Sequence, residues 1–213
     1  MVSSAMTETT DPMPPPPEGM LPRDYDRAAI VLALGARSIV LVGMMGAGKS
    51  SIGRRLAGEL GIVFVDADAE IEKAAGMSIP EMFDFKGEEY FRSGEARVIA
   101  RLLDCGPQVL ATGGGAFMNT RTRGLVRDKG ISIWLKADIE VLLRRVKRRN
   151  DRPLLRDSDP AETLTQLLEQ RDPVYAEADL IIQSRDVPHE TIMTEIITAL
   201  AQKLGVPMRG VTP

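Results

Sequence analysis

The feature that most constrains this chain is a glycine-rich segment, Gly43-Met-Met-Gly46-Ala-Gly48-Lys49-Ser50, which fits the phosphate-binding pattern G-x-x-x-x-G-K-[ST]. It follows an apolar run at 38–42 and opens a helical pattern at 49–60, which is the strand–loop–helix context that the motif requires. Glycines let the backbone turn with positive φ and bring its N–H groups to phosphate oxygens, while the helix N-terminus adds a positive dipole end. The alternative, a glycine-rich turn that happens to precede Lys-Ser, does not account for the flanking strand and helix.

This loop predicts specific nucleotide contacts. The Lys49 ammonium would supply a point charge for the β- and γ-phosphates, and the Ser50 hydroxyl can ligate Mg²⁺. We therefore expect Lys49 to be catalytic. We expect ATP to be bound by Gly46, Ala47, Gly48, Lys49, Ser50 and Ser51.

The rest of the chain alternates short apolar runs with longer amphipathic stretches, which indicates the α/β class. Unbroken apolar strands interleaved with helices are typical of a parallel sheet covered on both faces. We expect a five-stranded parallel sheet sandwiched by helices. The predicted strands are 38–42, 62–65, 109–111, 131–135 and 180–182. The predicted helices are 49–60, 69–75, 78–85, 87–103, 120–128, 138–148, 161–171 and 189–204.

The length of 213 residues suggests one domain, here 38–204, with appended segments. Six of the fourteen prolines fall within the first 22 residues, so 1–23 is predicted to be a disordered tail. A docking motif for an SH3-like partner is the alternative for this segment. Residues 24–37 read as a helical N-terminal extension that ends at Gly35, and 205–213 as a C-terminal tail.

Composition excludes several classes of function. One cysteine excludes an internal disulfide framework and a multi-cysteine metal site, and one histidine disfavours histidine-based zinc sites and Ser-His-Asp hydrolysis. The net charge is −3, and the basic run 144–157 holds no aromatic residue for base stacking, so we expect no nucleic-acid partner. No run of about 18 uncharged apolar residues occurs and no Lys or Arg precedes Arg23. We therefore expect a cytoplasmic protein without a membrane partner.

Two carboxylates follow the second predicted strand, at the sheet edge where open α/β folds bind ligands. In Asp66-Ala67-Asp68, an extended chain would point both side chains the same way, toward one crevice. Such a pair suits a Mg²⁺ ion with its water and a hydroxyl donor. The alternative is that one of the two is only the N-cap of the helix that begins near Ala69.

Six segments together resemble the shikimate kinase family in order and spacing. They are GMMGAGKSSIGRRLA, FVDADAEIE, SIPEMFDFKGEEYFRSGE, TGGGA, RPLL and QRDPVY, and the resemblance runs from about Ser38 to Leu204. It implies a P-loop kinase of the nucleoside-monophosphate-kinase-like branch, with a five-stranded parallel sheet and a mobile lid at about 147–159. It also implies transfer of the γ-phosphate of ATP to the 3-hydroxyl of shikimate, in the biosynthesis of aromatic amino acids. Shikimate and ATP would be the ligands, Mg²⁺ the cofactor, and the expected oligomeric state is a monomer.

The resemblance assigns roles to residues on the acceptor side. It implies that Arg92 and Arg171 bind the substrate carboxylate, which suits two planar guanidinium forks. It implies that Asp68 accepts hydrogen bonds from substrate hydroxyls and takes the proton, and that Asp66 holds Mg²⁺ through water. Arg92 and Glu95 are spaced i, i+3 on a predicted helix and can pair, which would orient the guanidinium.

Further assignments concern backbone approach, the base and the lid. Gly113, Gly114 and Gly115 would let backbone N–H groups approach the substrate. The resemblance implies that Arg145 stacks on adenine and that Arg152, in the lid, is a catalytic residue that reaches the transferring phosphate. We expect the loop 185–188 to border the adenine. We also expect that Cys105 is half-buried, His189 lies on the surface and Trp134 lies in the core.

Two alternatives stay open from the sequence. A small P-loop kinase for another polyol or hydroxy acid such as gluconate would share the loop but would not need the FR..E, GGG and QR.P.Y segments together. A nucleotide-binding regulatory module without catalysis is the other, although every catalytic-type position holds a competent residue.

Overall fold

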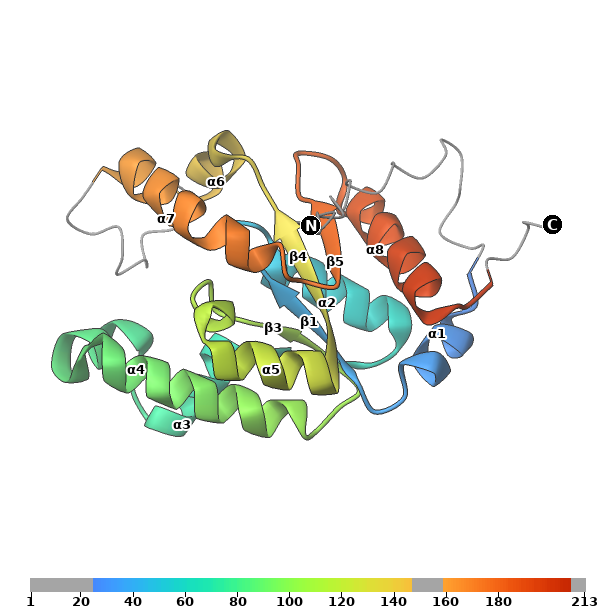
Figure 1. The fold of residues 1–213 in the computed structure, drawn as a ribbon, viewed down its shortest axis with the longest axis horizontal. Helices are drawn as coiled ribbons and strands as arrows, with labels where there is room; N and C mark the ends of the chain where they lie inside the picture. Colours follow the sequence, from blue (N-terminus) through green and yellow to red (C-terminus); the bar gives the residue numbers. More distant parts are fainter. Residues whose placement is uncertain (1–24, 147–158, 208–213) are drawn as a thin grey trace, which may run out of the picture.

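The computed structural model describes residues 25–146 and 159–207, which form a five-stranded parallel sheet flanked by helices (Figure 1). The strands lie in the order β2-β3-β1-β4-β5, and every neighbouring pair is parallel. Their bounds are β1 Ser38–Val42, β2 Val63–Asp66, β3 Gln108–Ala111, β4 Gly130–Lys136 and β5 Leu180–Gln183. The predicted fold class and all five strands are confirmed, with shifts of one residue at some ends.

The helices also follow the sequence pattern, with two differences. They are α1 Arg27–Leu34, α2 Lys49–Leu60, α3 Ala67–Ala75, α4 Ile79–Leu103, α5 Thr120–Lys129, α6 Ile139–Val146, α7 Pro160–Tyr175 and α8 His189–Leu204, with a 3₁₀ turn at Ala116–Met118. Gly87 has a non-helical backbone (φ 81°, ψ 167°) and kinks α4 into two helical parts, which agrees with the predicted pair 78–85 and 87–103. Helix α7 is longer than the predicted 161–171, because it continues through Pro173 to Tyr175. The helix predicted to begin at Ala69 begins at Ala67, since Asp66 caps it.

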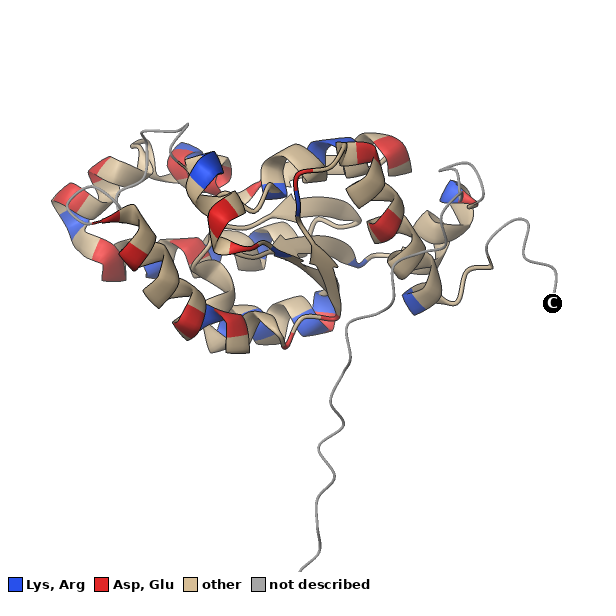
Figure 2. Cartoon of the chain, turned by 90° about the horizontal axis from the view of Figure 1, so that it is seen from above, with Lys and Arg blue, Asp and Glu red and all other residues tan. Residues whose placement is uncertain are grey.

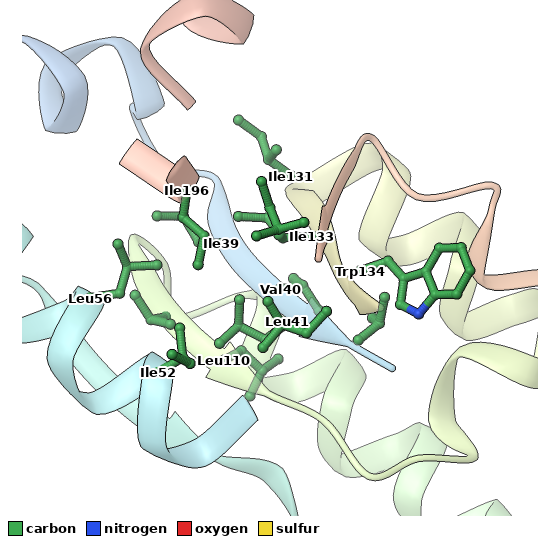
Figure 3. Packing of buried hydrophobic residues seen from close by; sticks show 14 of the residues in the cluster. Ile39, Val40, Leu41, Ile52, Leu56, Leu110, Ile131, Ile133, Trp134 and Ile196 are labelled. Atoms are coloured by element: carbon green, nitrogen blue, oxygen red, sulfur yellow. The ribbon is translucent and has the colours of Figure 1, made fainter. Parts of the chain in front are cut away.

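The core lies on both faces of the central strands. Ile39, Val40 and Leu41 of β1 are fully buried between helices of the two layers (Figure 3). Helices α1, α2 and α8 contact one another on one side of the sheet, while α4 and α5 pair on the other (Figure 1). Charged residues of both signs are spread over the helices, whereas the strands are mostly uncharged (Figure 2). This distribution is the one expected for a parallel sheet with both faces covered.

The helical extension is part of the same core. Asp26 caps α1 by accepting a hydrogen bond from the Ala29 N–H, and Gly35 (φ 61°) ends it as predicted. Ile30 and Leu34 are buried and belong to the cluster that contains β1. Helix α1 therefore packs onto α8 and onto α2, the helix that follows the phosphate-binding loop.

Three predicted features lie outside the described residues: the tail 1–23, Arg152 with nearly all of the lid, and the end of the C-terminal tail. Across 25–146 and 159–207, no helix has the length and apolar character needed to span a bilayer.

Candidate active site

The carboxyl ends of β1, β2 and β3 meet at one edge of the sheet and open onto a cavity of about 770 Å³. The register places Asp66 of β2 opposite Ala111 of β3, and Ala111 opposite Leu41 of β1. The strands β1, β2 and β3 therefore end side by side. The segments that follow them, which are the phosphate-binding loop, the cap of α3 and the three glycines, begin next to one another. This is the crevice at which open α/β sheets bind ligands.

Most of the predicted site residues line this cavity. They are Gly46, Gly48, Lys49, Ser50, Ser51, Asp66, Asp68, Gly113, Gly114 and Arg145. We call the part bordered by residues 46–51, Arg145 and 184–189 the nucleotide end. We call the part around Asp68, Gly113 and Gly114 the acceptor end, and we include in it Arg92, Gly115 and Arg171, which adjoin the glycine loop but do not line the cavity.

The phosphate-binding loop has the backbone that the motif requires. Gly43, Gly46 and Gly48 have φ of 130°, 82° and 97°, values that side chains disfavour. Gly48, the N-cap of α2, offers no side chain to the first-turn N–H groups, so these remain available to an anion. The Lys49 ammonium donates to the carbonyl oxygens of Gly43 (2.7 Å) and Met44 (2.9 Å), which holds it over the loop.

Asp66 joins the loop to the second strand. Its Oδ2 accepts a hydrogen bond from the Ser50 hydroxyl at 2.7 Å, and its Oδ1 accepts from the Asp68 N–H at 3.2 Å. Asp66 is therefore the N-cap of α3, as the alternative interpretation had it, and it also accepts a hydrogen bond from Ser50. The prediction that the two carboxylates align on an extended chain is wrong, because Asp68 already lies in the first turn of α3. They share the cavity because the chain turns at the cap.

Ser50 and Asp66 together fit a magnesium ion. A hydroxyl and a carboxylate are the hard oxygen ligands that Mg²⁺ prefers. The described residues contain no group of three or more His, Cys, Asp or Glu side chains arranged to hold a metal. A Mg²⁺ ion at this point would complete its shell from nucleotide phosphates and water, as Mg²⁺ commonly does.

The acceptor end is built on α4, whose start is set by a capping box. The Ser78 hydroxyl accepts from the Glu81 N–H and the Glu81 carboxylate accepts from the Ser78 N–H. A small apolar cluster of Ile71, Met82 and Phe91 then holds α3 against α4. These contacts fix the helix from which Arg92 and Glu95 project.

Arg92 is oriented by two carboxylates of its own helix. Its guanidinium contacts Glu95 at 2.9 Å and Glu88 at 3.0 Å, which confirms the i, i+3 pairing that the sequence predicted. Burial raises the pKa of Glu95, whose side chain is only 4% exposed, and the charge of nearby Asp68 raises it further against the pull of Arg92. The pKa of Arg92 is raised as well: burial alone would lower it, but Glu95 and Glu88 together outweigh that effect. The carboxylate resists ionisation because it is the more buried partner.

Two of the three glycines after β3, Gly113 and Gly115, make room for these side chains. A Cβ on Gly113 would lie 2.8 Å from both Asp68 Oδ1 and Glu95 Oε1, and a Cβ on Gly115 would collide with the Arg92 guanidinium. Oε1 of Glu95 is buried and has no hydrogen-bond partner. From the sequence, these glycines are expected to let the backbone approach a ligand. The structure adds that Gly113 and Gly115 also leave space for protein side chains in their observed rotamers.

Arg171 reaches the same loop from α7. It is 8% exposed and donates to the carbonyl oxygen of Gly114 at 3.2 Å. The hydroxyl of Tyr175, one helical turn later, donates to the same oxygen. Burial raises the pKa of Tyr175 to about 12, so it remains a donor at neutral pH. Sequence reasoning missed Tyr175, although the i, i+4 spacing to Arg171 within QRDPVY was a usable signal.

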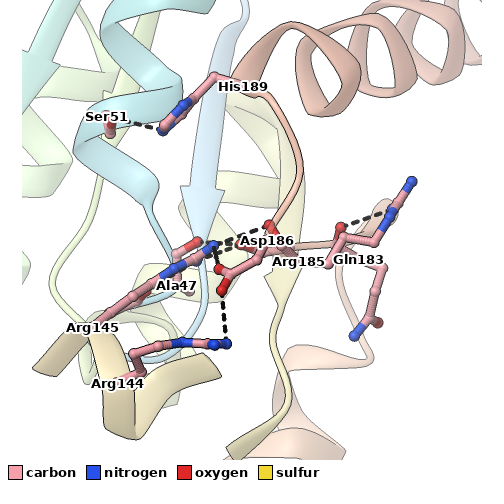
Figure 4. Close-up of polar contacts among 10 residues, drawn as sticks. Ala47, Ser51, Arg144, Arg145, Gln183, Arg185, Asp186 and His189 are labelled. Atoms are coloured by element: carbon pink, nitrogen blue, oxygen red, sulfur yellow. Dashed lines mark hydrogen bonds and ion pairs between the residues drawn. The ribbon is translucent and has the colours of Figure 1, made fainter. Parts of the chain in front are cut away.

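Arg145 closes the nucleotide end from α6 (Figure 4). Its guanidinium donates to Ser184 Oγ (2.9 Å), Gly46 O (3.3 Å) and Arg185 O (3.1 Å), and it pairs with Asp186 (3.2 Å). Ser184 in turn donates to the carbonyl of Ala47 at 2.8 Å, so the segment after β5 is tied to the phosphate-binding loop. The prediction that 185–188 borders this end is consistent with its lining. Ser184 and His189 were not predicted as site residues, and Asp186 was covered only by the prediction for the loop 185–188.

Three further expectations have clear outcomes. Trp134 is buried in the core, as predicted, and its ring lies 5.7 Å from that of Tyr175. Cys105 was expected to be half-buried but is exposed, because it follows the end of α4 instead of packing beneath it. His189 is exposed as expected, yet it also lines the cavity.

Known proteins provide an independent comparison with this geometry. The sequence matches the family model described as shikimate kinase over residues 45–201. The chain belongs to the shikimate kinase family. A shikimate kinase from Bradyrhizobium diazoefficiens is 64% identical over 177 residues, which cover 83% of this chain and 86% of that protein. One from Caulobacter vibrioides is 58% identical over 169 residues, covering 79% and 84%.

Solved structures agree with the family assignment. The structure of shikimate kinase from Acinetobacter baumannii in complex with shikimate has a TM-score of 0.78 at 36% identity, covering 84% of this chain and 98% of that one. A gluconokinase from Sinorhizobium meliloti has a TM-score of 0.57 at 22% identity, a likeness that shows the fold alone. Membership of the shikimate kinase family confirms the predicted class of enzyme, an ATP-dependent phosphotransferase with the P-loop kinase fold.

Proposed function

We propose that this protein transfers the γ-phosphate of ATP to the 3-hydroxyl of shikimate, giving shikimate 3-phosphate and ADP. The observation that carries the proposal is the convergence of Arg92 and Arg171 on the glycine loop beside Asp68. Two guanidinium groups suit one carboxylate, and a carboxylate oxygen beside them suits hydroxyl groups. An acceptor with both groups on a small ring, as in shikimate, matches this set.

At the nucleotide end, the chain itself binds and orients the triphosphate. The N–H groups of Gly46, Ala47, Gly48 and the first turn of α2 would donate to phosphate oxygens, with Ser51 contributing at the α-phosphate side. Lys49 would exchange its loop carbonyls for the β- and γ-phosphates and offset the charge that spreads over the transferring group. Arg145, held in place by Ser184 and Asp186, would lie against the adenine.

At the acceptor end, the chain holds the hydroxyl and receives its proton. Asp68 would accept a hydrogen bond from the reacting hydroxyl and take its proton as the new O–P bond forms. Arg92 and Arg171 would hold the substrate carboxylate at a distance from that oxygen. We assign the remaining stabilisation of the transferring phosphate to Arg152, which lies outside the described residues.

We place Mg²⁺ beside Ser50 and Asp66, with Asp66 acting through water. When bound, the ion would neutralise phosphate charge between the β- and γ-groups. The protein holds Ser50 Oγ and Asp66 Oδ2 2.7 Å apart, on two residues that line the cavity. A cytoplasmic location and a monomeric state stay predictions from the sequence.

The test is release of ADP from ATP and Mg²⁺ with candidate acceptors offered one at a time. We expect strong stimulation by shikimate and little by gluconate or a nucleoside monophosphate, because of these three only shikimate carries a carboxylate and hydroxyl groups on one small ring. Quinate, a close analogue, measures how strictly the ring is recognised. Lys49→Ala is the control for contaminating ATPase activity. Equal turnover with shikimate and gluconate would refute the proposal.

A further inference from the structure

His189 brings a second helix N-terminus to the nucleotide end. It is the only histidine of the chain and the first residue of α8, after an N-cap (Pro188) that makes no side-chain hydrogen bond. Both Pro188 and His189 line the cavity. The N-terminal turns of α2 and α8 therefore border one space, and each is free of a side-chain cap.

A direct contact joins these two turns. His189 Nε2 lies 3.2 Å from the hydroxyl oxygen of Ser51, in the first turn of α2 (Figure 4). Arg55, one turn further along α2, donates to the same oxygen at 2.9 Å and to the Ser51 carbonyl at 3.0 Å. Since Arg55 already donates to this oxygen, the Ser51 hydroxyl can donate its own hydrogen to His189 Nε2 in the tautomer that carries no hydrogen on that atom.

We propose that His189 is a positioning residue for the nucleotide: it fixes the rotamer of Ser51, and through Ser51 it strengthens binding of the nucleotide on its α-phosphate side. Ser51 has a short side chain that rotates freely unless its hydroxyl is held from two sides. Arg55 holds it from within α2 and His189 from α8, across 138 positions of sequence. Ordering this hydroxyl before the nucleotide arrives reduces the entropy lost on binding. The proposal rests on the nucleotide site proposed above.

The first experiment measures ADP binding by calorimetry and steady-state kinetics for His189→Ala. We expect the dissociation constant for ADP and the KM for ATP to rise about three- to tenfold, the range for one hydrogen bond. Neither kcat nor the KM for shikimate should change, because His189 touches no reacting group. His189→Gln can place a polar atom near the position of Nε2 and should restore most of the affinity. Thr191→Ala, an exposed position in the same turn that does not line the cavity, should change nothing.

A double-mutant cycle with Ser51→Ala tests the route of the effect. In the Ser51→Ala background, His189→Ala should weaken ADP binding no further. Additive losses would overturn the proposal, since His189 would then act without Ser51. A lower Tm with unchanged ADP affinity would also overturn it, since the contact would then only stabilise the packing of α8 against α2.

Arg145→Ala separates this inference from the site on which it rests. If Arg145→Ala weakens ADP binding while His189→Ala does not, only the role of His189 fails; if neither does, the nucleotide site fails as well.

Discussion

At the nucleotide end of the cavity, the groups that we propose to bind the ligand are mainly consecutive backbone N–H groups of residues 46–51. At the acceptor end, the proposed binding groups are side chains on α3, α4 and α7. The nucleotide end depends on one loop and the helix that follows it, so its geometry is largely set by positive φ at Gly46 and Gly48. The acceptor end depends on contacts between elements. Arg92 of α4 and Arg171 of α7 both reach the glycine loop, and Asp68 and Glu95 both border Gly113.

This difference indicates which substitutions should impair nucleotide binding and which should impair acceptor binding. Phosphate binding by a loop is common to many nucleotide-using proteins and places no demand on the second substrate. Recognition of one acceptor needs charged side chains at fixed positions, and here their clearances leave no room for a methyl group at Gly113 or Gly115. Substitutions at the acceptor end should therefore impair acceptor use while nucleotide binding survives.

The largest expected effect that sharpens this comparison comes from Asp68→Asn. Removal of a proton acceptor should lower kcat about 10²- to 10⁴-fold, while the dissociation constant for ADP stays near that of the parent protein. Asp66→Asn, two residues earlier, should instead raise the Mg²⁺ concentration needed for half-maximal rate, because Asp66 faces Ser50. Magnesium titrations that do not distinguish the two variants would contradict this division of roles.

A smaller but more specific effect is expected from Gly115→Ala. Gly115 has φ of −95°, which any residue adopts, so the substitution acts only through the collision of the new methyl group with the Arg92 guanidinium. Displacing one charged hydrogen-bonding group should raise the KM for shikimate about 10- to 100-fold and leave ADP affinity unchanged. Gly124→Ala is the matched control, since a Cβ there meets nothing within 4 Å. If ADP binding weakens as much as shikimate binding, the two ends are not independent.

The smallest effect concerns stability and the charge of Glu95. Its pKa is raised in the folded protein, so the native state binds a proton more tightly than the unfolded chain does. The contribution of Glu95 to the free energy of unfolding is then fully present below the ordinary Glu pKa of about 4.3 and is lost as pH rises through the raised value. Urea denaturation of the parent protein and of Glu95→Gln at several pH values measures this slope.

The expected outcome is that the stability of the parent relative to Glu95→Gln falls as pH increases across that window. A difference that stays constant with pH would show that Glu95 ionises normally. An increase would show that pairing with Arg92 outweighs burial, contrary to the unpartnered Oε1.

Local patterns in the sequence were sufficient to predict most helices and strands and the phosphate-binding loop. The glycine spacing of 43–50 identified the phosphate-binding loop, the apolar runs identified all five strands, and α8 has the predicted bounds of 189–204. These features depend on backbone conformation and on near neighbours in the chain, which sequence patterns record directly. The resemblance of six motifs then identified the family before any contact was known.

Only the tertiary structure showed which residues that are distant in sequence contact one another. It showed that the chain turns at Asp66, so that Asp68 borders the cavity from the first turn of a helix, and that the absence of a Cβ at Gly115 leaves space for the Arg92 guanidinium. It also placed Tyr175 against Gly114 and His189 against Ser51, contacts that span 61 and 138 positions. Such contacts depend on the packing of whole helices against the sheet and on clearances smaller than a methyl group, and no local pattern of residues records either of them.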